Sequence, residues 1–158
     1  PAVEVVPFSR TAGAALLDVD GKATWVVVVH LHPGEVEMRA REAALLDARV
    51  AELMGVSDRV VVLGDFNCDL DERVHRDLQA RGFVNAMERV GGGVQLTMDT
   101  VGISPWRIDH IYASPALAPG LRRAAVERRA GFRHDGPQVK GLWVHSDHLP
   151  VVAEFAGD

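Results

Sequence analysis

The feature that most constrains this chain is a short apolar run that ends in a glycine and two polar residues. Residues 60–63 read Val-Val-Val-Leu and are followed by Gly64. A short β-branched run of this kind predicts a strand buried on both faces of a sheet, and we expect Gly64 to let the chain turn as it leaves that strand. Asp65 and Asn67 alternate about Phe66, which puts both polar side chains on one side of the chain. Taken alone, this segment is either a plain turn or a site that positions a water, a metal ion or a phosphate, and both interpretations stay open.

The length and composition indicate a soluble globular protein. The 158 residues are 47% hydrophobic and 25% charged, which suffices for a core, and we expect a single domain over residues 1–158. No apolar run approaches the roughly 20 residues that span a bilayer, and the start of the chain lacks the pattern of a signal peptide. The chain begins with Pro1 rather than Met, which we interpret as processing or truncation, so the compartment stays open.

Charge and cysteine content narrow the function further. The net charge of −5 is not typical of a protein that binds nucleic acid through a basic face, although it suits an enzyme that meets phosphate through divalent cations. Cys68 is the single cysteine, so an internal disulfide is excluded. We expect Cys68 to be a core or rim residue rather than a nucleophile, because nothing near it in the sequence marks a base reserved for it.

The first part of the chain predicts a hairpin followed by a β-helix-β unit. We predict strands over residues 3–6, 13–19, 23–29 and 59–63 and a helix over 35–54. Asp20-Gly21 between two apolar runs indicates the hairpin. The valine-rich segment 25–29 is expected to be buried on both faces. Apolar residues at three- and four-residue steps from Met38 to Met54, among them Leu45 and Ala48, indicate the helix, and Gly55 indicates its end.

The second part predicts a short polar helix and three further strands. We place the helix over residues 71–81 and the strands over 106–113, 123–128 and 149–155. Residues 121–130 have helical propensity, yet we prefer a strand because the chain otherwise has nothing to carry it back across the sheet. The segment 85–104, with three consecutive glycines, is expected to be a loop that acts as a mobile lid or specificity region.

Polar, titratable residues lie at the ends of the most apolar strands. They are His30 and His32, Asp65 and Asn67, Asp109 and His110, and Asp147 and His148. Burying so many of them is costly unless they meet one another or a ligand. Ligands usually sit at the strand ends of an open sheet, so these residues predict a common site.

Four segments together resemble the endonuclease/exonuclease/phosphatase superfamily. They are Val29-His30-Leu31, Gly64-Asp65-Phe66-Asn67, Arg107-Ile108-Asp109-His110-Ile111 and Ser146-Asp147-His148-Leu149-Pro150-Val151. All four occur in the order of the family, and the resemblance covers residues from about 10 to 155. It implies a deoxyribonuclease I-like α/β (α+β) sandwich with mixed, largely antiparallel sheets and flanking helices.

The resemblance covers only the C-terminal portion of the family fold. Family members begin with a half that is absent here, and that half carries an Asn and a metal-binding Glu. Half of a two-layer sandwich leaves an apolar sheet face uncovered. The chain is then a fragment of a larger enzyme, a deliberately shortened piece, or a short natural protein that dimerises. We favour the fragment, so the partner that covers the face is the missing N-terminal half or a second copy of the chain.

The resemblance also implies a metal-dependent phosphoester hydrolase that works by in-line attack of water. His148 acts as the general base or binds the phosphate, and Asp109 holds its imidazole in the correct tautomer. Asp65 orients or deprotonates the water, and Asn67 donates to a phosphoryl oxygen. His30 contacts the phosphate or the leaving oxygen.

The implied cofactor is Mg²⁺ or Mn²⁺, held by Asp147 with Asp65 and Asn67. The substrate is a nucleic acid, a phosphoinositide or a phospholipid head group, because one fold serves all three. The alternative is a catalytically incomplete fragment, or a non-catalytic module that binds phosphate or protein. Thr97 either helps at the phosphate or is a plain loop residue, and His75 and His110 are expected at the surface or in supporting positions.

Overall fold

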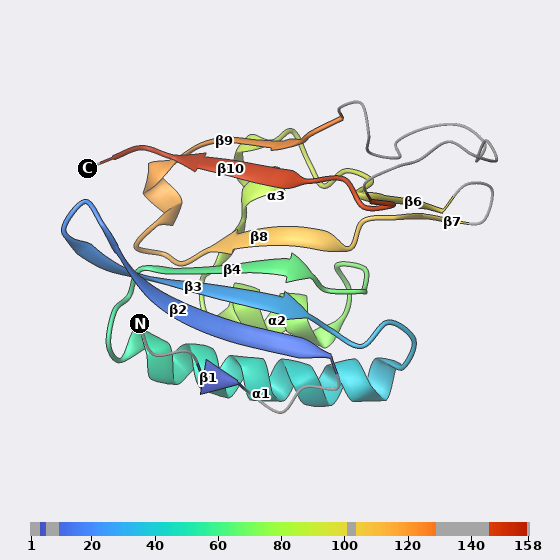
Figure 1. The fold of residues 1–158 in the computed structure, drawn as a ribbon, viewed down its shortest axis with the longest axis horizontal. Coiled ribbons are helices and arrows are strands. Elements are labelled where there is room, and N and C mark those ends of the chain that lie inside the picture. The colour runs from blue at the N-terminus through green and yellow to red at the C-terminus, as the bar shows by residue number, and fades with distance from the viewer. Residues whose placement is uncertain (1–3, 6–9, 101–103, 129–145, 158) are drawn as a thin grey trace.

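The computed structural model describes residues 4–5, 10–100, 104–128 and 146–157. Its main layer is a six-stranded sheet with the strand order β1-β2-β3-β4-β8-β5 (Figure 1). The strands are β1 (Glu4–Val5), β2 (Thr11–Val19), β3 (Lys22–His30), β4 (Val60–Asp65), β8 (Asp109–Ala113) and β5 (Val84–Asn85). Within this sheet β3 and β4 are parallel and the other neighbours are antiparallel. The predicted mixed, largely antiparallel sheet is therefore confirmed.

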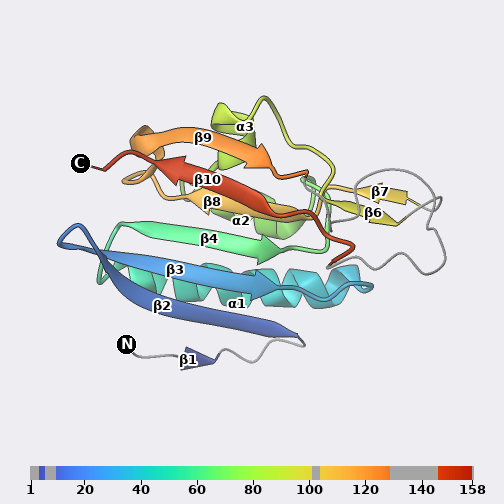
Figure 2. The same cartoon turned by 45° about the horizontal axis from the view of Figure 1, so that its top comes forward.

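The remaining elements lie on the two faces of this sheet or, for β6 and β7, beyond its end (Figure 1). They are α1 (Val36–Met54), α2 (Arg73–Ala80), α3 (Ala86–Val90), the 3₁₀ turn η1 (Ala118–Gly120), and two small antiparallel sheets, β6 (Met98–Thr100) with β7 (Ser104–Trp106) and β9 (Leu121–Val126) with β10 (Val151–Phe155). One core lies between the sheet and helices α1 and α2, and a second joins β4 and β8 to α3, β9 and β10 (Figure 2). None of the described helices is long and apolar enough to cross a membrane.

The hairpin and the β-helix-β unit form as predicted. Asp20 and Gly21 have φ values of 53° and 76°, the left-handed conformations that a two-residue hairpin turn needs. Helix α1 then connects the parallel strands β3 and β4, and Gly55 caps its C-terminus. The strand preferred over a helix near 123–128 is also confirmed, because β9 pairs with β10.

The prediction that β3 is buried on both faces is wrong. Val27 and Val29 are 2% and 1% exposed on the face that packs against α1, whereas Val28 on the opposite face is 48% exposed. The reason is that the second layer is too narrow to cover β3. The core that β9 and β10 form with the sheet includes Val61 of β4 but no residue of β3.

The buried face of α1 also differs from its predicted apolar pattern. Leu45 is 41% exposed, whereas Arg39 and Glu42 are buried at 6% and 2%. Glu42 accepts a hydrogen bond from the His32 backbone N–H at 2.8 Å, and Arg39 donates to the His32 carbonyl oxygen at 3.0 Å. Arg39 also forms a two-pronged ion pair with Glu72 at 2.8 and 2.5 Å. These partners satisfy the buried charges and hold the loop that follows His30.

The prediction of a loop over 85–104 holds for residues 91–97 but is wrong for Ala86–Val90 and Met98–Thr100, which form α3 and β6. The side chain of Asn85 accepts hydrogen bonds from the backbone N–H groups of Met87 and Glu88 and so caps α3. The single strand predicted over 106–113 is broken in two, because Trp106 ends β7 and β8 starts only at Asp109. Residues 131–141, whose glycines and prolines predict a loop, lie outside the described residues.

Gly64 has a different role from the predicted turn. It lies inside β4, which continues to Asp65, and its φ is 136°. A Cβ atom at this position would lie 1.9 Å from the carbonyl oxygen of Val29 on β3. The left-handed residue after the strand is instead Asn67, with φ 50°. Glycine at 64 is therefore required by the close approach of two parallel strands.

We expect Gly64→Ala to lower the free energy of unfolding by about 3 kcal/mol, because the added methyl overlaps backbone that cannot move aside. Gly13→Ala is the matched control, since a Cβ there meets nothing within 4 Å. Urea unfolding of both variants measures the difference. Wild-type stability in the Gly64 variant would contradict this account of the strand.

Candidate active site

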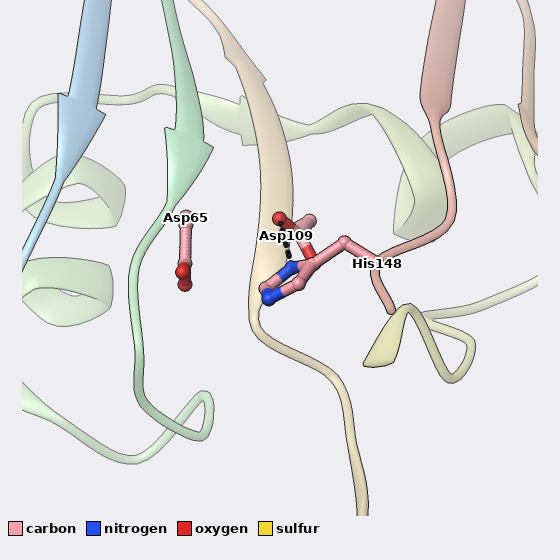
Figure 3. A group of neighbouring side chains, drawn as sticks. All are labelled: Asp65, Asp109 and His148. Carbon is pink, nitrogen blue, oxygen red and sulfur yellow. Dashed lines mark hydrogen bonds and ion pairs between the residues drawn. The ribbon is translucent and has the colours of Figure 1, made fainter. Parts of the chain in front are cut away.

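The strand register brings three polar residues side by side. His30 at the end of β3 is the partner of Asp65 in β4, and Asp65 is the partner of Asp109 in β8. Residues at the same register position of neighbouring strands point to the same face of a sheet. The fourth, His148, comes from the segment before β10, in the other layer (Figure 3). The group therefore forms where the two layers meet.

Asp109 and His148 form a close pair. Nδ1 of His148 lies 2.9 Å from Oδ2 of Asp109 and 3.1 Å from Oδ1. This hydrogen bond raises the pKa of His148 above its usual 6.5, against the opposing effect of burial, and the charge of Asp109 adds to it. With Nδ1 bound to the carboxylate, Nε2 is the ring nitrogen left to exchange a proton with a ligand.

Asp65 is held from two directions. Its Oδ1 accepts a hydrogen bond from the Asn67 backbone N–H at 2.8 Å, and its Oδ2 accepts one from Asn67 Nδ2 at 3.1 Å. His30 Nε2 lies 3.5 Å from the same Oδ2. Burial raises the pKa of the Asp65 carboxyl, and the neighbouring charge of Asp109 also raises it. Asp65 is thus an oriented carboxylate with a raised affinity for a proton or a cation.

The side-chain amide of Asn67 is committed within the protein. Besides Asp65, Nδ2 donates to the carbonyl oxygen of Leu31 at 2.9 Å. The two hydrogens of Nδ2, which we expected to donate to a phosphoryl oxygen, are therefore both bonded within the protein. The acceptor atom Oδ1 remains the part of this side chain that can turn toward a ligand.

The donor set of the site suits a small cation. Ligand atoms of Asp65, Asp109 and His148 all lie within 4.8 Å of one another. Two carboxylates are the donors that Mg²⁺ and Mn²⁺ favour. Asp147, the residue expected to bind the metal, is exposed and lies outside this group, although its charge raises the pKa of His148.

Cavities open on both sides of these residues. One of about 350 Å³ lies between the layers and is lined by Leu63, Asp109, Ile111, His148 and Val151 among others. The other, of about 420 Å³, lies beside Asn67 and is lined by residues that include Arg39, Glu72 and Trp106. A ligand at Asp109 and His148 has room in the first cavity, and a ligand at Asn67 has room in the second.

Thr97 braces the site. It is 1% exposed, and its Oγ1 accepts hydrogen bonds from the backbone N–H groups of Ile108 and Asp109 at 3.2 and 3.1 Å. Its carbonyl oxygen accepts from Leu149 N at 2.6 Å. Thr97 thus joins the start of β8 to the segment that carries His148. The sequence does not signal this role, because the three segments are far apart along the chain.

A buried polar cluster lies directly beneath the site. His75 and His110 are 0% and 1% exposed, so they occupy supporting positions rather than the surface. Burial lowers the pKa of His75 to about 4 and that of His110 to about 3, and both rings are neutral at pH 7. Cys68 is 3% exposed, and burial raises the pKa of its thiol to about 12. The expectation that Cys68 is a core residue is confirmed.

Comparison with known proteins points to one family. A family model described as Endonuclease/Exonuclease/phosphatase matches residues 2–127. No curated protein matches the chain in sequence.

Three solved structures share the fold. A 3′ phosphatase, NExo, from Neisseria, bound to a product DNA hairpin, has a TM-score of 0.75 at 23% identity, over 98% of this chain and 70% of that one. Truncated TDP2 from Caenorhabditis elegans has a TM-score of 0.76 at 21% identity, over 99% and 66%. A mannosyl-6-phosphatase from Bacteroides thetaiotaomicron has a TM-score of 0.69 at 20% identity, over 93% and 56%. The chain therefore spans about half to two thirds of the lengths of such structures, and this likeness concerns the fold.

We expect Asp109→Asn to lower the pKa of His148, because the variant loses the charge that favours the imidazolium. A raised pKa means that protonated His148 stabilises the fold below pH 6.5, and that this stabilisation is lost as the pH rises through the folded-state pKa. The loss of stability in the variant should therefore be largest at acid pH.

A titration of the imidazole resonances by NMR, in buffer with a chelator, measures the shift. Asp58→Asn, at an exposed carboxylate, is the control. An unchanged pKa of His148 in the Asp109 variant would show that the pair does not set its protonation.

Proposed function

The chain belongs to the Endonuclease/Exonuclease/phosphatase family, and we propose that it is a metal-dependent phosphoester hydrolase that directs an activated water in line at phosphorus. The observation that carries the proposal is the group of Asp65, Asp109 and His148, whose ligand atoms lie within 4.8 Å of one another. An oriented imidazole beside a carboxylate of raised pKa is the equipment that general-base hydrolysis needs.

In this proposal His148 is the general base. Asp109 accepts the hydrogen bond from Nδ1–H, which fixes the tautomer and leaves the lone pair of Nε2 for the proton of the water. Asp109 also stabilises the imidazolium that forms when the proton is taken. Because the pKa of His148 is raised, the neutral, active ring becomes more populated as the pH rises above 6.5.

Asp65, Asn67 and His30 position the reacting groups. Asp65 lies across the strand pair from Asp109 and orients the water between them. Asn67 holds Asp65 through Nδ2, and when a phosphoryl group enters, the amide can exchange this bond for one to a phosphoryl oxygen. The side chain of His30 is 44% exposed next to Asp65, from where it contacts the phosphate or the leaving oxygen.

Asp65 and the Oδ1 atom of Asn67 are the groups that would hold Mg²⁺ or Mn²⁺, and Asp147, which is exposed and outside the group of Asp65, Asp109 and His148, is the further ligand that the resemblance implies. The raised pKa of the Asp65 carboxyl supports this fit. Burial and the facing Asp109 both raise this pKa, and a bound cation relieves both effects. When bound, the ion supplies positive charge that offsets the charge of the phosphate.

The substrate is proposed as a phosphoester of a nucleic acid, a phosphoinositide or a phospholipid head group. One of the structural neighbours is described with a DNA hairpin product and another as a sugar phosphatase. The net charge of −5 weakly disfavours long duplex DNA. The competing proposal is a binding module that has lost catalysis, and it predicts phosphate binding without affinity for divalent ions.

We expect turnover of a bis-aryl phosphodiester in the presence of Mg²⁺ or Mn²⁺, and a loss of at least about 100-fold in kcat for Asp65→Ala and for His148→Ala. The control is Asp58→Ala, because Asp58 is exposed and lies before the start of β4, whereas Asp65 lies at its end. Calorimetric titration with Mn²⁺ runs alongside. Activity that survives both substitutions, or a wild-type chain that binds the ion without turnover, would overturn the assignment.

We also propose that the missing N-terminal half of the family fold covers the open face of β2 and β3. On this face Leu17 and Val28 are 44% and 48% exposed, next to Ala15 and Val26 in the register. Contiguous apolar side chains at a sheet face are typical of a surface that another segment covers. The chain spans only 66% and 56% of two structural neighbours, which supports an additional segment as the cover.

Sedimentation velocity and binding of an apolar fluorescent dye test this cover. We expect the chain alone to be monomeric and to bind the dye, and Val28→Lys to reduce dye binding, because the charge interrupts the apolar face. Thr11→Lys, at an exposed position of the same sheet, is the control. A dimer that Val28→Lys dissociates would identify a second copy of the chain as the cover instead.

A further inference from the structure

The segment that carries Asp65 and Asn67 has a second, inward-facing side. Phe66 and Cys68 alternate with the two polar residues and are 0% and 3% exposed. Each site residue is therefore separated by a single peptide from a side chain anchored in the core. The core contacts that hold Phe66 and Cys68 therefore also orient the side chains of Asp65 and Asn67.

Both inward-facing residues contact His75 of α2. The ring of Phe66 stacks on the imidazole with centroids 5.2 Å apart and an interplanar angle of 19°. The Sγ atom of Cys68 lies 3.4 Å from His75 Nε2. His75 is 0% exposed, so it is a fixed point for this segment rather than a mobile neighbour.

His75 is in turn tied to the sheet. Its Nδ1 lies 2.8 Å from the hydroxyl of Tyr112, which is 0% exposed in β8. A neutral imidazole has one donor and one acceptor nitrogen, so the chain from Cys68 through His75 to Tyr112 is satisfied in either direction. Because β8 also carries Asp109, the same strand supports both sides of the site.

We infer that His75 is a positioning residue, which holds Asp65 and Asn67 in their working orientation through its buried contacts with Phe66, Cys68 and Tyr112. The inference rests on the proposed function of the site and adds a residue outside it. Asn67 takes a left-handed φ of 50°, which Asn adopts more readily than most residues but still at a cost in free energy. In that conformation its amide donates to both Leu31 and Asp65. Releasing the anchor should therefore loosen both residues.

The test is His75→Phe, which keeps an aromatic ring and removes both hydrogen bonds. We expect kcat to fall roughly 10- to 100-fold with little change in KM, as for misplaced catalytic groups. The second readout does not depend on activity. The Asn67 side-chain amide protons, bonded to Leu31 and Asp65 in the wild type, should exchange with solvent at least about 10-fold faster in an NMR experiment.

Val50→Ala is the control for general loss of stability, since Val50 is 0% exposed and lies on the core face of α1, in the same core as Phe66 and Cys68 but on a different element. It should leave both readouts unchanged at a comparable loss of stability. If His75→Phe does not fold, Tyr112→Phe removes the hydroxyl that bonds His75, together with its hydrogen bond to Asn85, and is read in the same way. Unchanged amide exchange in these variants, or an equal effect of Val50→Ala, would overturn the inference. A wild-type chain without turnover would instead overturn the proposed function, and the amide exchange would still decide on His75.

Discussion

The site depends on the pairing of β4 with a parallel strand on one side and an antiparallel strand on the other. This register sets His30, Asp65 and Asp109 in one row across three neighbouring strands. The row requires β3 and β4 to approach so closely that Gly64 has no space for a side chain. The most apolar strands of the protein thus end in its most polar residues. The free energy gained by burying the valines before them holds the carboxylates near each other despite their repulsion.

Buried polar groups around the site are kept either neutral or paired. His75 and His110 are neutral because burial disfavours their charged forms, whereas Arg39 keeps its charge by binding Glu72. Both solutions avoid an isolated buried charge, the most costly state of a side chain in a core. They also fix segments next to the site: Arg39 and Glu42 hold the loop after His30, and His75 contacts the segment after Asp65.

Local sequence signals predicted most of the elements, and three of the polar residues that they singled out, Asp65, Asp109 and His148, lie together, but these signals did not predict what supports that group. An Asp-Gly pair strongly favours a two-residue hairpin turn, and Asp20-Gly21 forms one. The valine runs form β3 and β4 as expected. The exposure of Val28 was missed because alternation along a strand does not say how wide the covering layer is. The burial of Arg39 and Thr97 was missed for a related reason. Each has hydrogen-bond partners distant in sequence, and a polar side chain alone predicts a surface position.

The origin of His148 in the second layer has a consequence for folding. His30, Asp65 and Asp109 come together once the main sheet forms, but His148 joins them only when the C-terminal strand has docked against β9. The separation of 39 residues between Asp109 and His148 is no larger than that between Asp65 and Asp109, so the pair depends on the docking of the second layer rather than on loop length. A chain with only the main sheet and its helices folded would show native-like circular dichroism and lack the Asp109–His148 pair. The pair would therefore form only once the second layer has docked, and its formation is a sensitive report that the whole domain is assembled.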